Sequence, residues 1–264
     1  MRVFRFILLT TLILSNTHSY ANEQKEFSAE EIAQFQISKK VELQDIRNKN
    51  MPVLDRLANS QILEVRLLTA DPNWNQMGSQ FGHNLVRFVV DPKNPLEDIV
   101  IGVEGQVNDP KISILKGFIG GYEVFLNVMT YAEYLQQYYL TEHRADRESI
   151  LEADTAQKKD LIEIYRKINQ DPAALVGKDY KFATNNCTVI LWKILVHANI
   201  VKINWKDFIP TVAAYESYVT AYPMKTASLL RSRGLIVGND QVLSWDERFL
   251  NSKPQDLLSS FRAD

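Results

Sequence analysis

Cysteine is almost absent from this chain of 264 residues, and its scarcity limits the possible chemistry. The single cysteine, Cys187, excludes an intrachain disulfide and any zinc site built from several cysteines. With 30 Lys and Arg against 32 Asp and Glu residues, the chain has no excess of positive charge with which to bind nucleic acid. Phosphate-binding glycine loops, Gly-x-Ser-x-Gly elbows and metal-ligand spacings are also missing, so we expect no metal and no cofactor.

Long apolar runs are missing as well, apart from one short run at the N-terminus. Arg2 and Arg5 flank the start of the apolar stretch 6–14, and Ser19-Tyr20-Ala21 places small residues at positions −3 and −1 of a cleavage site. This is the pattern of a secretory signal peptide, and the run is too short to span a bilayer. We expect residues 1–21 to be removed and the rest to reach a Gram-negative periplasm, with full secretion as the alternative.

Helical and strand patterns are mixed along the rest of the chain, which predicts an α+β fold. Apolar, β-branched runs predict strands, and capped periodic runs predict helices. We expect helices at 28–40, from Pro52, at 130–138, 154–168 and 187–199, strands at 61–69, 83–90, 98–104, 111–118, 122–129 and 180–183, an exposed strand at 140–151 and a mainly helical tail from Trp205. The expected organisation is an N-terminal helical segment (22–60), one main domain (61–236) and a C-terminal tail (237–264).

Cys187 stands where a reactive thiol is favoured. It follows Asn185-Asn186 and opens an apolar helix, so it faces unpaired backbone N–H groups and the positive end of the helix dipole. Both features favour the thiolate, which is the nucleophilic form. A lone thiol in an oxidising compartment also requires a reason. The alternative interpretation is that Cys187 is a small buried hydrophobic residue.

A cysteine nucleophile needs a base, and the four histidines differ in their ability to serve as one. His18 leaves with the signal peptide, and His197 lies about 15 Å along the same helix as Cys187. His143 falls in a charged run typical of a solvated face. His83 heads an apolar strand, where a polar side chain can meet a cleft, so we predict it as the base. The alternative is a satisfied core histidine.

Three further residues are candidates for supporting roles. Glu104, at the end of the next strand, could orient the imidazole of His83. Asn185, Asn186 and the backbone N–H of Cys187 are candidate donors to an oxyanion. Glu104 could equally be an ordinary carboxylate at a strand end, and Asn186 could serve only as a helix cap.

Two motifs in this order resemble a known family. Phe81-Gly82-His83-Asn84-Leu85-Val86-Arg87-Phe88 precedes Asn185-Asn186-Cys187-Thr188, with Glu142-His143-Arg144 between them. Over about residues 63–236 the combination is similar to the periplasmic N-terminal domain of the lipoprotein N-acyltransferase Lnb. Histidine on a strand before cysteine on a helix also resembles the circularly permuted papain-like enzymes, including the lecithin:retinol acyltransferase group. The resemblance implies a permuted papain-like (NlpC-like) fold, in which an antiparallel sheet packs on the core helix that carries the cysteine.

The resemblance also implies a function. Cys187 would be the nucleophile and His83 the base of acyl transfer through a thioester, with a phospholipid as donor and a lipoprotein amine as acceptor. The implied partners are a lipid or acylated substrate, a lipoprotein and a membrane surface contacted peripherally. Full-length members carry transmembrane segments after this domain, whereas this sequence ends at Asp264. Two alternatives therefore stay open: a cysteine amidase or peptidase acting on cell-wall or lipid amide or ester bonds, and a non-enzymatic periplasmic binding protein.

Overall fold

The structure is a computed structural model, and it describes residues 27–73, 82–110, 116–117, 120–182, 184–202 and 223–263. The expected signal peptide (1–21) lies outside the described residues, as does most of the strand expected at 111–118. Phe81 and the first part of the tail, 203–222, also lie outside them.

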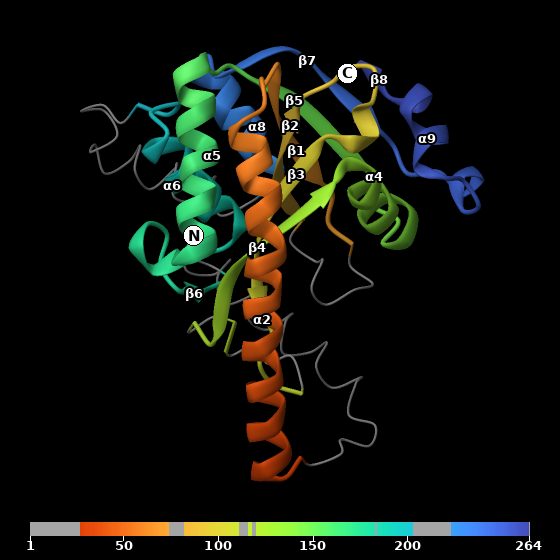
Figure 1. Cartoon of the computed structure of the whole chain (residues 1–264). Coiled ribbons are helices and arrows are strands. Elements are labelled where there is room, and N and C mark those ends of the chain that lie inside the picture. The colour runs from red at the N-terminus through yellow and green to blue at the C-terminus, as the bar shows by residue number, and fades with distance from the viewer. Residues whose placement is uncertain are drawn as a thin grey trace, which may run out of the picture.

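An antiparallel sheet of eight strands organises the described part of the chain (Figure 1). The strand order is β6-β4-β3-β2-β1-β5-β7-β8, which places β2 and β1 in the middle, each paired on both sides. The strands are β1 (Glu64–Ala70), β2 (His83–Val89), β3 (Ile99–Gln106), β4 (Tyr122–Thr130), β5 (Asp146–Leu151), β6 (Asp179–Tyr180), β7 (Ile236–Leu243) and β8 (Arg262–Ala263). The strands expected at 61–69, 83–90, 98–104 and 122–129 are confirmed as β1 to β4.

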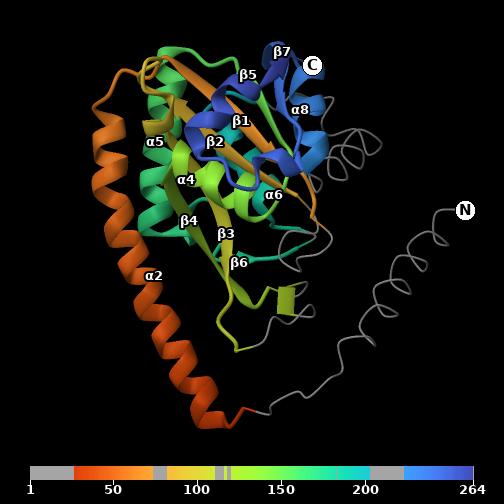
Figure 2. The ribbon, with the colours of Figure 1, turned by 90° about the vertical axis from the view of Figure 1, so that its right-hand side faces the viewer.

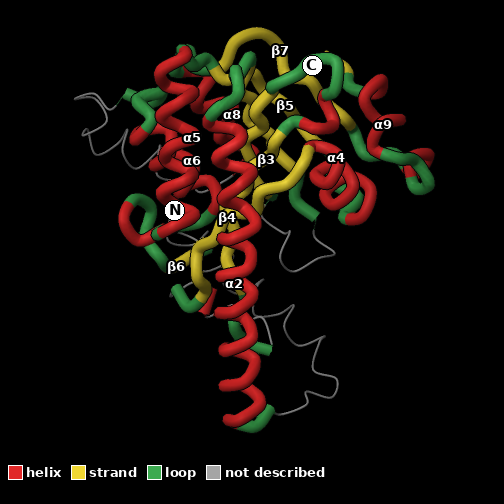
Figure 3. Tube along the Cα trace, viewed as in Figure 1, coloured by secondary structure: helices red, strands yellow, loops and turns green. Residues whose placement is uncertain are grey.

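Helices cover both faces of this sheet (Figure 3). One face packs against α2 (Ala29–Ala58), α5 (Thr155–Gln170), α6 (Cys187–His197) and α8 (Pro223–Ser232). The other face packs against α4 (Tyr131–Tyr134), the π-helical turns of η4 (Leu135–Thr141) and α9 (Pro254–Leu257). Short 3-10 turns occur at η3 (Pro95–Glu97), η5 (Pro172–Ala174), η7 (Glu247–Phe249) and η8 (Leu258–Ser260). The architecture is therefore α+β, as the sequence predicts.

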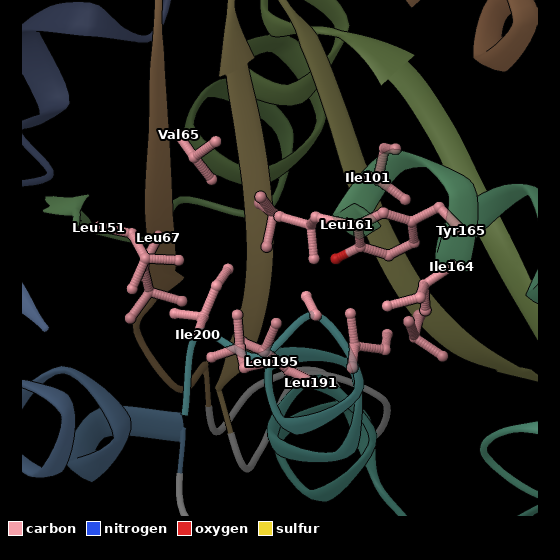
Figure 4. Close-up of a cluster of buried hydrophobic side chains, with 14 of the residues drawn as sticks. Val65, Leu67, Ile101, Leu151, Leu161, Ile164, Tyr165, Leu191, Leu195 and Ile200 are labelled. Atoms are coloured by element: carbon pink, nitrogen blue, oxygen red, sulfur yellow. The ribbon is translucent and has the colours of Figure 1, made fainter. Parts of the chain in front are cut away.

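The main hydrophobic core lies between the sheet and helices α5 and α6 (Figure 4). Strand side chains such as Leu67 and Ile101 face Leu161 of α5 and Leu191 of α6, and all four are at most 3% exposed. Truncating a buried leucine to alanine costs about 2–5 kcal/mol in such a core. The core therefore fixes α6, with Cys187 at its first position, against the central strands.

The N-terminal helix differs from the expectation of two short helices. Residues 29–58 form one helix that contains Pro52, instead of one helix at 28–40 and another beginning at Pro52. A proline inside a helix removes one hydrogen bond, but packing can compensate for this loss. Leu54 and Leu57 are buried, and the Asn50 side chain donates to the backbone oxygen of Leu126. Figure 2 shows that the N-terminal half of α2 extends past the end of the sheet.

The prediction of an exposed strand at 140–151 is wrong in both the exposure and the first residue of the strand. The strand, β5, begins at Asp146, lies between β1 and β7, and buries Asp146 and Glu148 to 2% exposure. Its polar alternation arises because these carboxylates have buried partners: Tyr134 donates to Asp146, and Arg87 pairs with Glu148. The preceding residues, including Glu142-His143-Arg144, lie before this strand and not on it.

The tail is less helical than expected. After α8 the chain adds β7, which pairs with β5, and β8, which pairs with β7. The tail therefore extends the same sheet instead of decorating it with helices alone.

Candidate active site

Cys187 is the first residue of α6, as the sequence predicts. The Asn186 side-chain oxygen caps the helix by accepting hydrogen bonds from the backbone N–H groups of Thr188 and Val189, at 3.1 and 3.0 Å. The next turn is anchored in the core by Ile190, which is fully buried. The thiol itself is only 3% exposed. Capping and packing thus hold the thiol on a rigid element.

His83 begins β2 and lies beside Cys187. Its ring is buried, and the residues that follow the two, Asn84 and Thr188, are hydrogen-bonded to each other, which brings the imidazole close to the thiol. Burial alone would raise the pKa of Cys187, but the charge of His83 and hydrogen bonds from His83, the Asn84 backbone N–H and Thr188 lower it to about 7. Burial would conversely lower the pKa of His83, but the Cys187 charge and hydrogen bond, together with the charge of Glu104, raise it. Each group therefore stabilises the charged form of the other.

The two residues that follow the pair are joined as well. Asn84, which follows His83, donates from its side-chain nitrogen to the hydroxyl of Thr188, which follows Cys187, at 3.1 Å. The same amide donates to Thr226 of α8 at 2.7 Å and accepts from Thr69 of β1 at 3.0 Å. All four side chains are buried. Asn84 therefore ties β1, β2, α6 and α8 together directly behind the thiol and imidazole.

Glu104 lies near His83 but makes its hydrogen bonds elsewhere. Its Oε1 atom accepts from the Asn127 side chain at 2.8 Å and from the Tyr138 hydroxyl at 3.2 Å. The Tyr138 ring in turn lies parallel to the His83 ring, with centroids 5.9 Å apart. The Nε2 atom of His83 is buried and has no hydrogen-bond partner within the described residues. Glu104 thus acts on the imidazole through its charge, and Tyr138 lies against the ring face.

Asn185 and Asn186 use their side chains to build the loop before α6. The Asn185 amide nitrogen donates to the backbone oxygen of Asp179, and its oxygen accepts from Lys193 at 2.6 Å. The Asn186 nitrogen donates to the backbone oxygen of Phe182, while its oxygen caps the helix. The structure places both residues next to the thiol in the chain, and these contacts shape the loop that positions it. Their suggested role as oxyanion donors stays a prediction.

Sequence reasoning missed Tyr180, whose hydroxyl lies at the site. The backbone N–H of Cys187 donates to the Tyr180 oxygen at 3.1 Å. Burial raises the pKa of Tyr180, and the hydroxyl is close enough to the thiol for the charge of Cys187 to raise this pKa further. A short strand was expected here, but nothing in the residue pattern distinguishes a tyrosine that faces the thiol from one that faces the core. Only the pairing of β6 with β4 places it there.

A second polar cluster lies farther along β2, on the face of the sheet that α4 and η4 cover. Arg87 of β2 forms ion pairs with Asp98 at 2.8 Å and with Glu148 at 3.0 Å, and its guanidinium lies 3.6 Å from the ring centroid of Tyr131. The cluster borders a cavity of about 380 Å³ that Arg66 also lines. The guanidinium nitrogens of Arg87 all donate to acceptors within the protein, so we interpret this cluster as structural.

The comparisons with known proteins identify one family. The family model of the Lnb N-terminal periplasmic domain matches residues 55–226, a span that includes both His83 and Cys187. Searches of curated proteins and of solved structures found no match. The helices within the described residues include none long and apolar enough to cross a membrane. The match covers more than half of the sequence, so this chain belongs to the family of the Lnb N-terminal periplasmic domain.

Proposed function

We propose that this protein is an exported thiol acyltransferase, in which Cys187 carries the acyl group as a thioester and His83 is the base. One observation carries the proposal: the only cysteine in the chain begins a core helix and lies beside a buried histidine at the start of a central strand of the sheet. A thiol whose pKa is lowered to about 7 is substantially ionised near neutral pH, as a nucleophile requires.

The proposed reaction has two halves. The Cys187 thiolate attacks the carbonyl carbon of an ester, a C–S bond forms, and the carbonyl electron pair moves to the oxygen. When the carbonyl re-forms, the bond to the leaving alcohol breaks, and the His83 imidazolium gives that alcohol its proton. An amine then attacks the thioester while His83 accepts its proton, which releases an amide and restores the thiolate. The negative charge of Glu104 favours the imidazolium on which both halves depend.

The arrangement supports the permuted papain-like fold as part of this proposal. In the described residues an antiparallel sheet packs on the helix that begins with the cysteine, and the histidine strand precedes that helix in the chain. The family description favours a periplasmic location and a relation to lipoprotein N-acylation. We therefore propose a phospholipid as the acyl donor and the N-terminal amine of a lipoprotein as the acceptor.

The test is capture of the thioester. The purified chain is incubated with mixed micelles of detergent and phosphatidylethanolamine, and its intact mass is followed with and without hydroxylamine, which cleaves thioesters. We expect one hydroxylamine-labile acyl group on the wild type and on His197→Ala, whose histidine is exposed at the far end of α6. Cys187→Ala should acquire none. Failure of the wild type to acquire an acyl group from phosphatidylethanolamine, and from phosphatidylglycerol tested in the same way, would refute the proposed donor.

A second step distinguishes a transferase from a hydrolase. The acylated protein is mixed with a diacylated lipopeptide that has a free N-terminal amine, and the products are separated by mass. Transfer of the acyl group to the lipopeptide supports the proposal. Release of free fatty acid at the same rate with and without lipopeptide would replace it with the hydrolase alternative.

A further inference from the structure

Tyr180 lies where a hydrogen-bond donor to the oxygen of the reacting carbonyl would be needed. Its oxygen is 3.1 Å from the backbone nitrogen of Cys187, the residue that carries the thiol. A carbonyl carbon attached to Sγ would have its oxygen close to both groups. Tyr180 therefore lies beside the atoms that react in the proposed function.

The hydroxyl of Tyr180 is able to donate. Its oxygen accepts the hydrogen bond from the Cys187 N–H, which leaves its own proton for another acceptor. Burial, followed by the charge of Cys187, raises the pKa of Tyr180 well above its usual value, so the phenol keeps that proton near neutral pH. In the resting site that proton can point towards the neighbouring thiolate. When negative charge moves from sulfur to the carbonyl oxygen, the same donor can follow it.

The amide side chains nearby are committed to other partners. Asn185 is bonded to Asp179 and Lys193, and Asn186 holds Phe182 and the first turn of α6. The Tyr180 hydroxyl, by contrast, is bonded to the Cys187 amide itself and still has its own proton to donate.

The fold fixes the ring of Tyr180 from two sides. Tyr180 pairs with Tyr122 of β4 across the sheet edge, and its ring meets the edge of Phe182 at a centroid distance of 6.3 Å. Gly105 of β3 lies against the ring, because a Cβ atom at this position would come within 2.8 Å of it. Glycine at residue 105 thus leaves room for the Tyr180 ring, and the packed ring holds the hydroxyl in position beside Cys187.

The geometry points to Tyr180 as a catalytic residue, whose hydroxyl and the backbone N–H of Cys187 together donate hydrogen bonds to the oxyanion formed when the thiolate attacks a carbonyl. This inference rests on the proposed function, since it requires a tetrahedral intermediate on Cys187. On attack, the Cys187 N–H exchanges its bond to the Tyr180 oxygen for one to the oxyanion. The Tyr180 hydroxyl keeps its proton and turns to donate a hydrogen bond to the same oxyanion. Collapse of the intermediate returns both donors to their resting partners.

The test compares two reactions of one thiol. Iodoacetamide alkylates the thiolate by direct displacement and forms no oxyanion, whereas a p-nitrophenyl ester acylates it through a tetrahedral intermediate. Both rates are measured at about pH 9, where a thiol of low pKa is ionised. Tyr180→Phe removes only the hydroxyl, and Tyr122→Phe is the matched control, because it removes a hydroxyl from the neighbouring strand.

We expect Tyr180→Phe to alkylate at a rate within about threefold of the wild type and to acylate at least about 100-fold more slowly. Tyr122→Phe should leave both rates unchanged. Equal acylation by Tyr180→Phe and wild type would overturn the role of Tyr180 and leave the proposed function standing. An equal loss of both rates would also overturn it, because Tyr180 would then only position the thiol. Wild-type protein that is alkylated but never acylated would refute the proposed function itself.

Discussion

Removing the imidazole of His83 should convert Cys187 into an ordinary buried thiol. In the folded protein burial raises the pKa of Cys187, and His83 is the principal group that lowers it to about 7. Without the imidazole, the Asn84 N–H and Thr188 remain as hydrogen-bond donors, but the opposing positive charge is gone. We therefore expect the thiol pKa of His83→Ala to return to its ordinary value of 9.0 or to exceed it.

The size of the effect follows from the ionised fraction. A thiol with a pKa of about 7 is about half ionised at pH 7, whereas one with a pKa of about 9 is about 1% ionised. Because only the thiolate reacts, alkylation at pH 7 should slow by about 50-fold. Two pKa units correspond to about 2.7 kcal/mol, which is the net stabilisation of the thiolate by all its surroundings, with His83 as the principal favourable part.

The assay follows alkylation by iodoacetamide as a function of pH, with the product measured by intact mass. The chain has one cysteine, so each modified molecule reports on Cys187 alone. His197→Ala provides the control, since this histidine lies at the opposite end of α6. A midpoint near pH 7 that does not move in His83→Ala would refute the assignment of His83 as the partner of the thiol. A wild-type midpoint near pH 9 would show an inert, structural cysteine.

Three further outcomes are expected. Glu104→Gln removes a charge that raises the pKa of His83, so less imidazolium is present to stabilise the thiolate. The pH midpoint of Cys187 alkylation should therefore move upward, by less than in His83→Ala, and an unmoved midpoint would count against an electrostatic role of Glu104. Thr226→Val leaves a buried N–H of Asn84 unpaired, which should lower the free energy of unfolding in urea by about 1–3 kcal/mol while the alkylation midpoint stays in place. Burial, reinforced by the charge of Glu148, raises the pKa of Asp146 in the folded protein. The folded protein therefore keeps a proton on Asp146 that the unfolded chain releases above about pH 3.8, so the free energy of unfolding falls as the pH rises. Asp146→Asn should therefore gain stability relative to the wild type between about pH 4 and pH 7, and a constant difference would show that this carboxyl is ionised in the fold.

Residues with a strong local pattern could be predicted from the sequence. Asn186 before an apolar run predicts a capped core helix, and the structure has that helix and that cap. Apolar, β-branched runs likewise predict β2 and β3 to within a few residues. The choice of His83 over the other histidines depended on helix geometry and strand position, and the structure brings His83 to the thiol. These features depend on short stretches of chain, which is why one sequence is enough to find them.

Features that depend on pairing between distant segments could not be found in this way. β5 appears exposed in the sequence because its buried partners, such as Arg87, lie on other elements. The Tyr180 hydroxyl reaches the thiol because β6 pairs with β4 and because Gly105 on a third strand leaves room for the ring. Pro52 indicates a helix start by its local preference, whereas contacts of α2 with the sheet and α5 continue the helix through it.

The place of His83 in the sheet links the chemistry of this protein to its cooperativity. His83 pairs with Ala70 of β1, and β2 is bonded to β3 as well from Leu85 onward, with its side chains buried along the whole strand. Backbone amides of such a strand exchange with solvent mainly through global unfolding. We therefore expect the doubly paired part of β2, which begins two residues after His83, to keep the imidazole beside the thiol until the sheet as a whole opens. On heating, the enhanced reactivity of the thiol should persist unchanged until the unfolding transition and vanish within it, so that inactivation and unfolding become one event.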